Sequence, residues 1–260
     1  MDLREKTAVV CGSTQGIGFE SAKLMAERGA SIILVARNQE KLEEAMGKLD
    51  SSAGQKHQYL VADFSKPQEL KSVLNEFVSA GNKPDILVNN TGGPKGGLII
   101  DADPQEFLDA FNQHLICNHI LVQALVPGMK ENGGGSIINV ISTSVKQPLN
   151  NLGVSNTIRG AVANWSKTMA NELGQFNIRV NNVLPGATNT GRLNSIAAVK
   201  AGKTNDSVES VLEGMAQQSP MQRIAEPTEV AEAIAFLASD RASYINGINI
   251  PVDGGRTKSL

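Results

Sequence analysis

The chain has 260 residues, 41% of them hydrophobic and 19% charged, and a formal net charge of -2 at pH 7. This composition is typical of one globular α/β domain, and the charge gives no reason to expect nucleic acid or an anionic membrane as a partner. The two cysteines, Cys11 and Cys117, provide no disulfide framework, which favours a cytoplasmic protein. The charged N-terminus leads directly into a strand-like stretch, and no apolar run approaches the roughly 18 residues of a membrane span, so we expect neither a signal peptide nor a membrane partner.

Short β-rich runs alternate with helical patterns along the chain. The runs lie at 7–12, 31–36, 59–63, 85–90, 136–142, 178–186 and 248–255, and the helical patterns lie at 17–28, 38–49, 67–81, 104–130, 151–174 and 227–240. This alternation predicts an α/β fold with a doubly wound parallel sheet, covered by helices on both faces. Since the sequence contains no repeat, low-complexity tract or interdomain linker, residues 1–260 are expected to form a single domain.

Residues 187–225 break this alternation. They are polar, contain Gly191, Gly202 and Gly214, and show only a weak helical signal. A long insertion after the carboxyl end of a strand is where a substrate lid lies in an open α/β sheet. We therefore expect this segment to cover a substrate.

The first βα unit carries a glycine-rich turn. Gly12, Gly16 and Gly18 follow the first strand run and open the first helix with the spacing G-x3-G-x-G. Glycines there let the backbone approach a pyrophosphate closely, while the helix N–H groups and the helix dipole face the negative charge. The same glycines could serve only a tight turn, but their place in the first βα unit favours nucleotide binding.

Several motifs in the same order resemble those of the short-chain dehydrogenase/reductase family. They are CGSTQGIG at 11–18, NNTG at 89–92, IRVNNVLPGATNT at 178–190, PMQRIAEPTEVAEAIAFLASD at 220–240 and YINGINIPVDGG at 244–255. The first motif has Cys11 where the family usually has threonine, and NNTG stands where the family has N-N-A-G. The resemblance covers nearly the whole chain and implies a Rossmann-type oxidoreductase with a nicotinamide cofactor.

The resemblance also implies a set of cofactor contacts. The expected residues are Gly12, Ser13, Thr14, Gly16, Ile17, Gly18, Arg37, Asp63, Asn90, Gly92, Arg159, Pro185, Gly186, Thr188 and Thr190. Ser13 and Thr14 could add hydroxyl donors for the phosphates. Asp63 could instead cap a helix, and Asn90 could satisfy the strand ends.

The end of the second strand run decides between NAD and NADP. The chain has Ala36 where the NAD-dependent members of the family tend to carry aspartate, and Arg37 follows. A carboxylate would repel a ribose 2′-phosphate, whereas a guanidinium group offers a planar, charge-assisted contact. Arg37 could also be only a solvated charge, but the pattern favours NADP(H) as the cofactor.

The catalytic positions implied by the resemblance carry unusual residues. Ser142 stands where the family has the serine that ends the fifth strand. The family's Tyr-x3-Lys begins thirteen residues later, where this chain has Ser155 and Arg159. His114 takes the place of the family's helical asparagine. A serine hydroxyl is a far weaker acid than tyrosine, whose ordinary pKa is about 10, and loss of a positioned general acid typically lowers a rate by about 10²–10⁴.

These substitutions leave two functions open. The first is an NADP(H)-dependent carbonyl reductase or alcohol dehydrogenase, of which a 3-oxoacyl reductase is one form, with an altered site. In it Ser142 would orient the carbonyl, Arg159 would bind the ribose one turn from Ser155, and Ser155, His114 or water would relay the proton. The alternative is an NADPH-binding sensor or scaffold with little or no activity. No metal site is expected, and the family precedent implies a homotetramer or dimer with the closing helix and strand at an interface.

Overall fold

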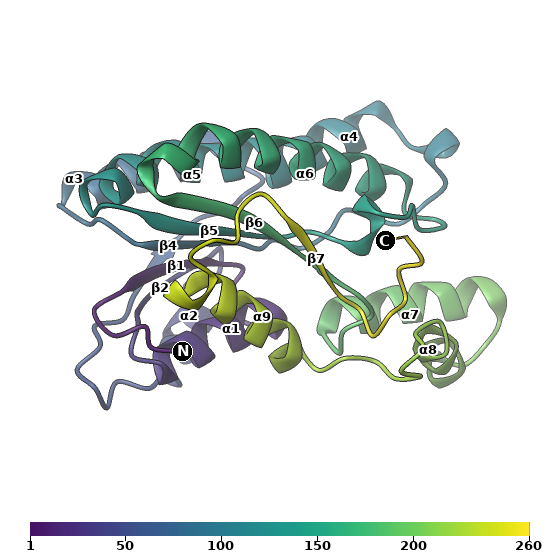
Figure 1. The fold of residues 1–260 in the computed structure, drawn as a ribbon. Helices are drawn as coiled ribbons and strands as arrows, with labels where there is room; N and C mark the ends of the chain where they lie inside the picture. The colour runs from purple at the N-terminus through teal and green to yellow at the C-terminus, as the bar shows by residue number, and fades with distance from the viewer. Residues whose placement is uncertain (260) are drawn as a thin grey trace.

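The computed structural model describes residues 1–259, and within them seven parallel strands form one sheet (Figure 1). The strands are β1 (Thr7–Cys11), β2 (Ser31–Ala36), β3 (Gln58–Val61), β4 (Ile86–Asn89), β5 (Gly135–Val140), β6 (Ile178–Pro185) and β7 (Asn249–Val252). Their order in the sheet is β3-β2-β1-β4-β5-β6-β7, and every neighbouring pair is parallel. The expected doubly wound parallel sheet is confirmed.

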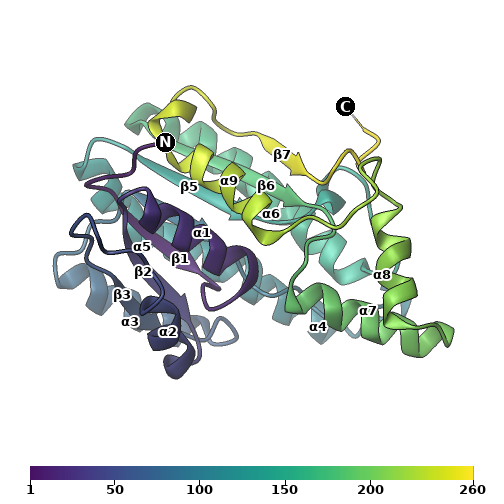
Figure 2. The same ribbon diagram turned by 90° about the horizontal axis from the view of Figure 1, so that it is seen from below.

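Helices cover both faces of the sheet (Figures 1 and 2). One layer holds α1 (Gly16–Glu27), α2 (Gln39–Met46) and α9 (Pro227–Ala238), and the other holds α3 (Pro67–Ser79), α4 (Pro104–Phe111), α5 (Cys117–Glu131) and α6 (Gly153–Leu173). Two further helices, α7 (Gly191–Thr204) and α8 (Val208–Ala216), lie apart from these layers, beyond the end of β6. Within residues 1–259 none of the helices combines the length and the apolar character that a membrane span requires.

The core consists of one apolar layer on each face of the sheet. Successive strand residues point to opposite faces, so Val10 packs in the layer that contains Met25 of α1 and Ile234 of α9, whereas Val9 packs in the layer that contains Leu121 of α5. Because both faces are buried, the central strands are continuous apolar runs rather than alternating ones.

A ladder of side-chain amides crosses the buried half of the sheet. Asn89, Asn139, Asn182 and Asn249 are register partners on β4, β5, β6 and β7. Each of the first three donates an amide N–H to the side-chain oxygen of the next, with N···O distances of 2.8, 3.0 and 2.8 Å. Ser166 of α6 joins the ladder by accepting from Asn139 at 2.8 Å and donating to Asn182 at 2.7 Å. The amide ladder therefore ties α6 to four strands.

The helical pattern at 104–130 divides into two helices. Between α4 and α5 the chain forms a π-helical turn, η2 (Asn112–Ile116). A π turn holds one more residue than an α turn, so it rotates the following residues by about 100° around the helix axis. Such turns occur frequently at functional sites, and His114 lies in this one.

The 187–225 segment is more regular than its weak helical signal indicated. Thr190 caps α7 by accepting from the Leu193 N–H at 3.3 Å, and Ser207 caps α8 by accepting from the Ser210 N–H at 3.1 Å. Each cap satisfies a backbone donor that a helix start leaves unpaired. The two helices pack on each other through a small apolar cluster of Ala197, Ala201 and Val211.

Candidate active site

The candidate site lies where the strand order reverses. Neighbouring strands β1 and β4 are followed by α1 and α4, which lie on opposite faces of the sheet. In open α/β sheets ligands bind outside the carboxyl ends of such strands, and we call this region the crevice. The sequence-predicted residues that follow these and the next strands are Gly12, Asn90, Ser142 and Gly186. The fold thus brings the predicted cofactor and catalytic positions to one edge of the sheet.

The glycine turn can be built only from glycines. Gly12 and Gly16 have positive φ angles of 58° and 56°, which favour glycine. A Cβ atom on Gly12 would lie 2.5 Å from the Asn90 carbonyl oxygen, and one on Gly18 would lie 2.2 Å from the Gly12 carbonyl oxygen. Gln15, the N-cap of α1, makes no side-chain capping bond, so the first N–H groups of α1 can face a phosphate. The turn fits a pyrophosphate.

The side chains of this turn have different surroundings. Ser13 is fully buried, and its hydroxyl accepts from the Val35 N–H at 3.0 Å on β2. The hydroxyl also donates its own hydrogen to the Val35 carbonyl at 3.4 Å, so it is engaged with β2 in both roles and is not the free donor that the sequence suggested. Thr14 and Ile17 are half-buried beside it.

Arg37 follows β2 and Asp63 follows β3, and the two side chains are close enough to interact electrostatically. Arg37 is exposed directly after β2. One Asp63 carboxylate oxygen accepts from the Ser65 N–H at 2.9 Å and from its hydroxyl at 2.8 Å. The backbone bond from Ser65 is the main cause that lowers the pKa of Asp63, and the positive charges of Arg37 and Lys66 add to it. Asp63 therefore stabilises its own turn and keeps one oxygen for another partner.

Asn90 joins β4 to the glycine turn. Its amide Nδ2 lies 3.3 Å from the carbonyl oxygens of both Cys11 and Gly12. Gly92, two residues further, has open space where a Cβ atom would point. Asn90 thus supports the turn, in agreement with the alternative that it satisfies strand ends, while Gly92 leaves room beside it.

The start of the 187–225 segment faces the glycine turn. The Cγ2 atom of Thr190 would lie 3.1 Å from a Cβ atom on Gly16. Pro185 ends β6 beside β7, and the buried Thr188 donates its hydroxyl to the Gly186 carbonyl at 3.2 Å. The start of the 187–225 segment therefore lies against the glycine turn, so the two predicted groups of cofactor residues are neighbours.

Ser142, Ser155 and Arg159 come from β5 and α6. The Ser142 hydroxyl accepts from the Ser144 N–H at 3.1 Å and keeps its own hydrogen for donation. Ser155 is half-buried in the first turn of α6. Arg159, one turn later, is only 7% exposed; its Nη1 donates to the Val140 carbonyl at 3.4 Å, and its Nε has no partner. Burial, together with the charge of Arg192, lowers the pKa of Arg159 to about 10.

His114 is buried behind these residues. It is 1% exposed, its Nδ1 lies 2.5 Å from the Thr91 hydroxyl, and its Nε2 has no partner. Burial is the main cause that lowers the pKa of His114 to about 2, and the positive charges of Arg159 and Arg192 act in the same direction. His114 is therefore neutral near pH 7, so it does not supply a proton as an imidazolium acid.

The structure adds two residues that the sequence analysis missed. Thr91, the hydrogen-bond partner of His114, stands where the family's N-N-A-G has alanine, and that departure was its only signal. Arg192 lies in the first turn of α7 and donates to the Pro94 carbonyl across the crevice. No signal in the sequence points to Arg192, because its contact with Pro94 depends on where α7 is placed.

Neither tyrosine of the chain lies in the crevice. Tyr59 on β3 donates to Glu43 of α2 at 2.8 Å, and Tyr244 is fully exposed between α9 and β7. Neither tyrosine is therefore placed to act as a general acid at the position that Ser155 occupies on α6.

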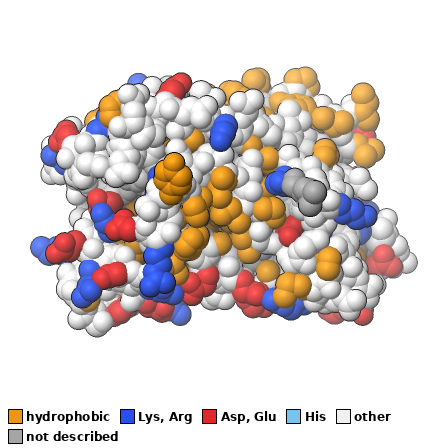
Figure 3. All heavy atoms as spheres, viewed as in Figure 1, with side chains coloured by type: hydrophobic (Ala, Val, Ile, Leu, Met, Phe, Trp, Pro, Cys, Tyr) orange, Lys and Arg blue, Asp and Glu red, His pale blue; other side chains and the backbone are white. Residues whose placement is uncertain are grey.

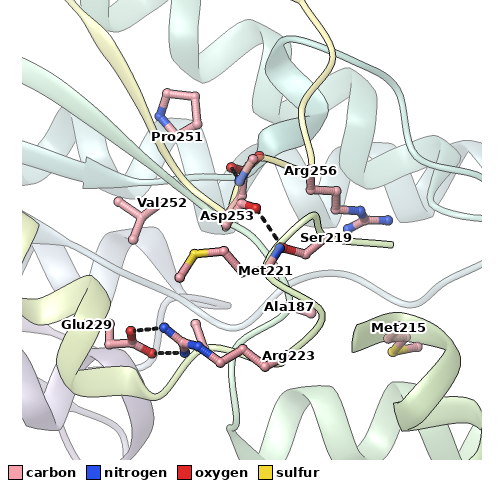
Figure 4. Close-up of a pocket in the computed structure, with 13 residues that line it drawn as sticks. Ala187, Met215, Ser219, Met221, Arg223, Glu229, Pro251, Val252, Asp253 and Arg256 are labelled. Atoms are coloured by element: carbon pink, nitrogen blue, oxygen red, sulfur yellow. Dashed lines mark hydrogen bonds and ion pairs between the residues drawn. The ribbon is translucent and has the colours of Figure 1, made fainter. Parts of the chain in front are cut away.

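A separate cavity of about 270 Å³ lies between the 187–225 segment and the end of β7 (Figure 4). Arg223 and Glu229 pair beside it through two contacts of 2.6 Å. None of the four catalytic candidates lines it.

In the part of the chain that the structure describes, no three His, Cys, Asp or Glu residues are grouped to hold a metal ion.

Comparison with known proteins assigns the class. A family model described as enoyl-(acyl carrier protein) reductase matches residues 12–257. The chain therefore belongs to this family of short-chain dehydrogenases/reductases, and it is an oxidoreductase.

Three similar proteins illustrate the range of this family. The 3-oxoacyl-(acyl-carrier-protein) reductase FabG of Chlamydia trachomatis is 32% identical over 97% of this chain and 98% of its own length. The 3alpha-hydroxysteroid dehydrogenase of Mediterraneibacter gnavus is 33% identical over 98% of each chain. L-Sorbose reductase from Gluconobacter frateurii, solved with NADPH and L-sorbose, superposes with a TM-score of 0.93 at 34% identity and covers 100% of this chain and 99% of its own.

Proposed function

We propose that this protein is an NADP(H)-dependent oxidoreductase that interconverts a carbonyl compound and its alcohol. The observation that carries the proposal is a glycine turn with no room for side chains after β1, on the same edge of the sheet as Ser142 and the residues that follow β4 and β6. The similarity to L-sorbose reductase, which was solved with NADPH, and to YwfH, an NADPH-dependent reductase with a TM-score of 0.92 and 28% identity, supports this choice of cofactor.

The cofactor residues divide by the part of the cofactor they bind. The glycine turn and the start of α1 bind the pyrophosphate, and Arg37 binds the 2′-phosphate. Asp63 and Asn90 border the adenosine, and Thr188 and Thr190 border the nicotinamide. Arg159 donates to the nicotinamide ribose, as a lysine does in most relatives.

The chemistry of the site then follows from the remaining polar groups. The bound cofactor supplies a hydride to the carbonyl carbon. Ser142 donates a hydrogen bond to the carbonyl oxygen, and Arg159 stabilises the negative charge that develops there. Ser155 or a water molecule passes the proton to that oxygen. His114, neutral and bonded to Thr91, supports this arrangement rather than acting as the acid.

The test of this function compares the natural chain with a variant that restores the usual residues. NADPH oxidation is measured across a panel of carbonyl compounds for the natural chain and for Ser155→Tyr/Arg159→Lys. We expect turnover by the natural chain and a rise of about 10²–10⁴ in the variant, because the variant regains a general acid. Ser142→Ala is expected to slow both proteins. Normal rates in Ser142→Ala would remove that serine from the mechanism.

A second candidate function is an NADPH-binding sensor or scaffold without turnover. The distance of both tyrosines from the crevice favours it, since the site then lacks the family's usual acid. Both functions require NADPH binding, measured by quenching of Trp165 fluorescence or by calorimetry. They differ in the next step: a natural chain that binds NADPH but oxidises none of it, beside an active double variant, supports the sensor.

The face formed by β7 and α9 supports assembly into a dimer or tetramer. β7 is an edge strand, and hydrophobic side chains gather around it (Figure 3). An open strand edge with apolar neighbours is a typical contact between copies. Light scattering after gel filtration tests this; a monomer at micromolar concentration would contradict it.

The two buried, unpaired cysteines support a cytoplasmic location.

A further inference from the structure

Two arginine side chains from different helices converge beside Gly93. A Cβ atom on Gly93 would lie 3.5 Å from Nη2 of Arg192 and 3.9 Å from Nη2 of Arg159. Arg159 comes from α6, and Arg192 comes from α7 in the 187–225 segment. Gly93 follows β4, so the two guanidinium groups border one small space at the edge of the sheet.

Neither guanidinium group has a negative partner. Arg159, 7% exposed, has an unpartnered Nε and one hydrogen bond of 3.4 Å to the neutral Val140 carbonyl. The partner of Arg192 is the neutral Pro94 carbonyl. Within residues 1–259 no ion pair includes either arginine. Each guanidinium carries five N–H donors, so most of these donors remain for a ligand.

The positive charge in this space is also larger than two arginines alone would give. Arg192 lies in the first turn of α7, where the helix dipole already contributes partial positive charge. Like charges at close range disfavour one another, and burial of Arg159 increases that cost. An anion between the two guanidinium groups offsets both their mutual repulsion and the cost of burying the charge of Arg159.

The position of the space indicates which anion belongs there. The glycine turn and Arg37 account for the cofactor phosphates at the other end of the crevice. Arg159, in contrast, lies against Val140 at the end of β5, and Ser142 follows that strand. An anion held by Arg159 and Arg192 is therefore a neighbour of the reacting carbonyl. Two oxygens in a plane match the fork of a guanidinium group.

We propose that Arg159 and Arg192 together bind a carboxylate of the substrate next to its reacting carbonyl, so that the substrates are small oxo acids and the corresponding hydroxy acids. This inference rests on the proposed oxidoreductase function and narrows its substrate class. It also gives Arg159 a third contact, with the substrate carboxylate, beside those with the cofactor ribose and the carbonyl oxygen. Arg192 reaches the carboxylate from the first turn of α7, in the 187–225 segment.

The test is a calorimetric titration of the NADPH-saturated protein with matched ligands. The ligands are 2-oxobutyrate and 3-oxobutyrate, each beside its neutral methyl ester. For the natural chain we expect that whichever of the two oxo acids binds more tightly binds about ten- to a hundred-fold more tightly than its own ester. Charge-assisted hydrogen bonds to the carboxylate account for a difference of this size. In Arg192→Gln this preference falls to about one, and Arg192→Lys retains part of it.

Lys200→Gln is the matched control. Lys200 is an exposed cation on the same helix, about 12 Å along its axis from Arg192, so its removal changes the net charge equally and keeps the preference for the acid. Equal affinity for acid and ester in the natural chain overturns the proposal. So does an unchanged preference in Arg192→Gln, or no binding of either acid.

The measurements distinguish failure of the carboxylate site from failure of the proposed oxidoreductase function. NADPH binding is measured first, and the acid titrations are repeated without NADPH. Absence of NADPH binding contradicts the oxidoreductase function but leaves the carboxylate preference measurable on the ligand-free protein. Turnover of neutral carbonyl compounds with no preference for acids supports the oxidoreductase and overturns the carboxylate site.

Discussion

Protonation of His114 should destabilise the folded protein. Its pKa falls from the ordinary histidine value of 6.5 to about 2 in the fold, so between these values the unfolded chain binds one more proton than the folded protein. Stability therefore rises with pH across this window, is complete above about pH 6.5, and is lost as the pH falls. A full one-proton difference corresponds to about 1.4 kcal/mol per pH unit. Half of the unfolded-state rings are already protonated at pH 6.5, so lowering the pH from 6.5 to 4.5 removes about 2 kcal/mol through this one group.

Urea denaturation at a series of pH values measures this effect. Carboxylates also titrate in this range, so the natural chain is compared with His114→Asn, which carries the residue that relatives have there. The slope of unfolding free energy against pH should be smaller in the variant by about one proton. In the natural protein the ring resonances of His114 should show no titration above about pH 4. Equal slopes in both proteins, or a ring that titrates near pH 6, would refute the assignment of a buried neutral histidine.

Three further substitutions test other parts of the structure. Arg37→Asp should weaken NADPH binding by about ten-fold or more while NADH binding is spared, because a charge-assisted contact becomes a repulsion; equal losses for both cofactors in a fluorescence titration would contradict the phosphate assignment. Gly18→Ala places a Cβ atom 2.2 Å from the Gly12 carbonyl oxygen and should abolish NADPH binding in the same assay, so normal affinity would show that the turn is not the cofactor site. Asn182→Ala removes three hydrogen bonds of the amide ladder and should lower the unfolding free energy by about 3 kcal/mol in urea, whereas a loss below about 1 kcal/mol would mean that the ladder contributes little.

The sheet could be predicted well because its signal is local. Strands buried on both faces are continuous apolar runs, and the run at 31–36 coincides with β2. The division of 104–130 into α4 and α5 could not be predicted in this way, because the hydrophobic pattern is helical on both sides of it. The extra residue of η2 depends on tertiary packing around the buried His114. The helices of the 187–225 segment were missed because their apolar face is small, although Thr190 and Ser207 are typical N-caps.

The candidate site was predicted where the family motifs align and missed where contacts come from distant segments. The glycine turn follows β1 and packs against Asn90, as its place in the first βα unit indicates, and its cofactor role stays a prediction. The hydrogen bond between Ser13 and Val35, by contrast, depends on how β1 and β2 are placed. The approach of Arg192 to Arg159 joins residues from α7 and α6, and no spacing along the chain encodes it. Such long-range contacts arise from tertiary packing, which a single sequence does not display.

The amide ladder also helps to fix the register of β4, β5, β6 and β7. A one-residue slip of β5 or β6 would turn its asparagine to the opposite face of the sheet, where the amide would be buried without its partners. Misaligned pairings are thus penalised during folding, at the stage when parallel strands from distant parts of the chain must find one another. Strands in the native register bring the residues that follow their carboxyl ends to the same edge of the sheet. The crevice that depends on their ends is therefore assembled with the sheet itself, before any ligand arrives.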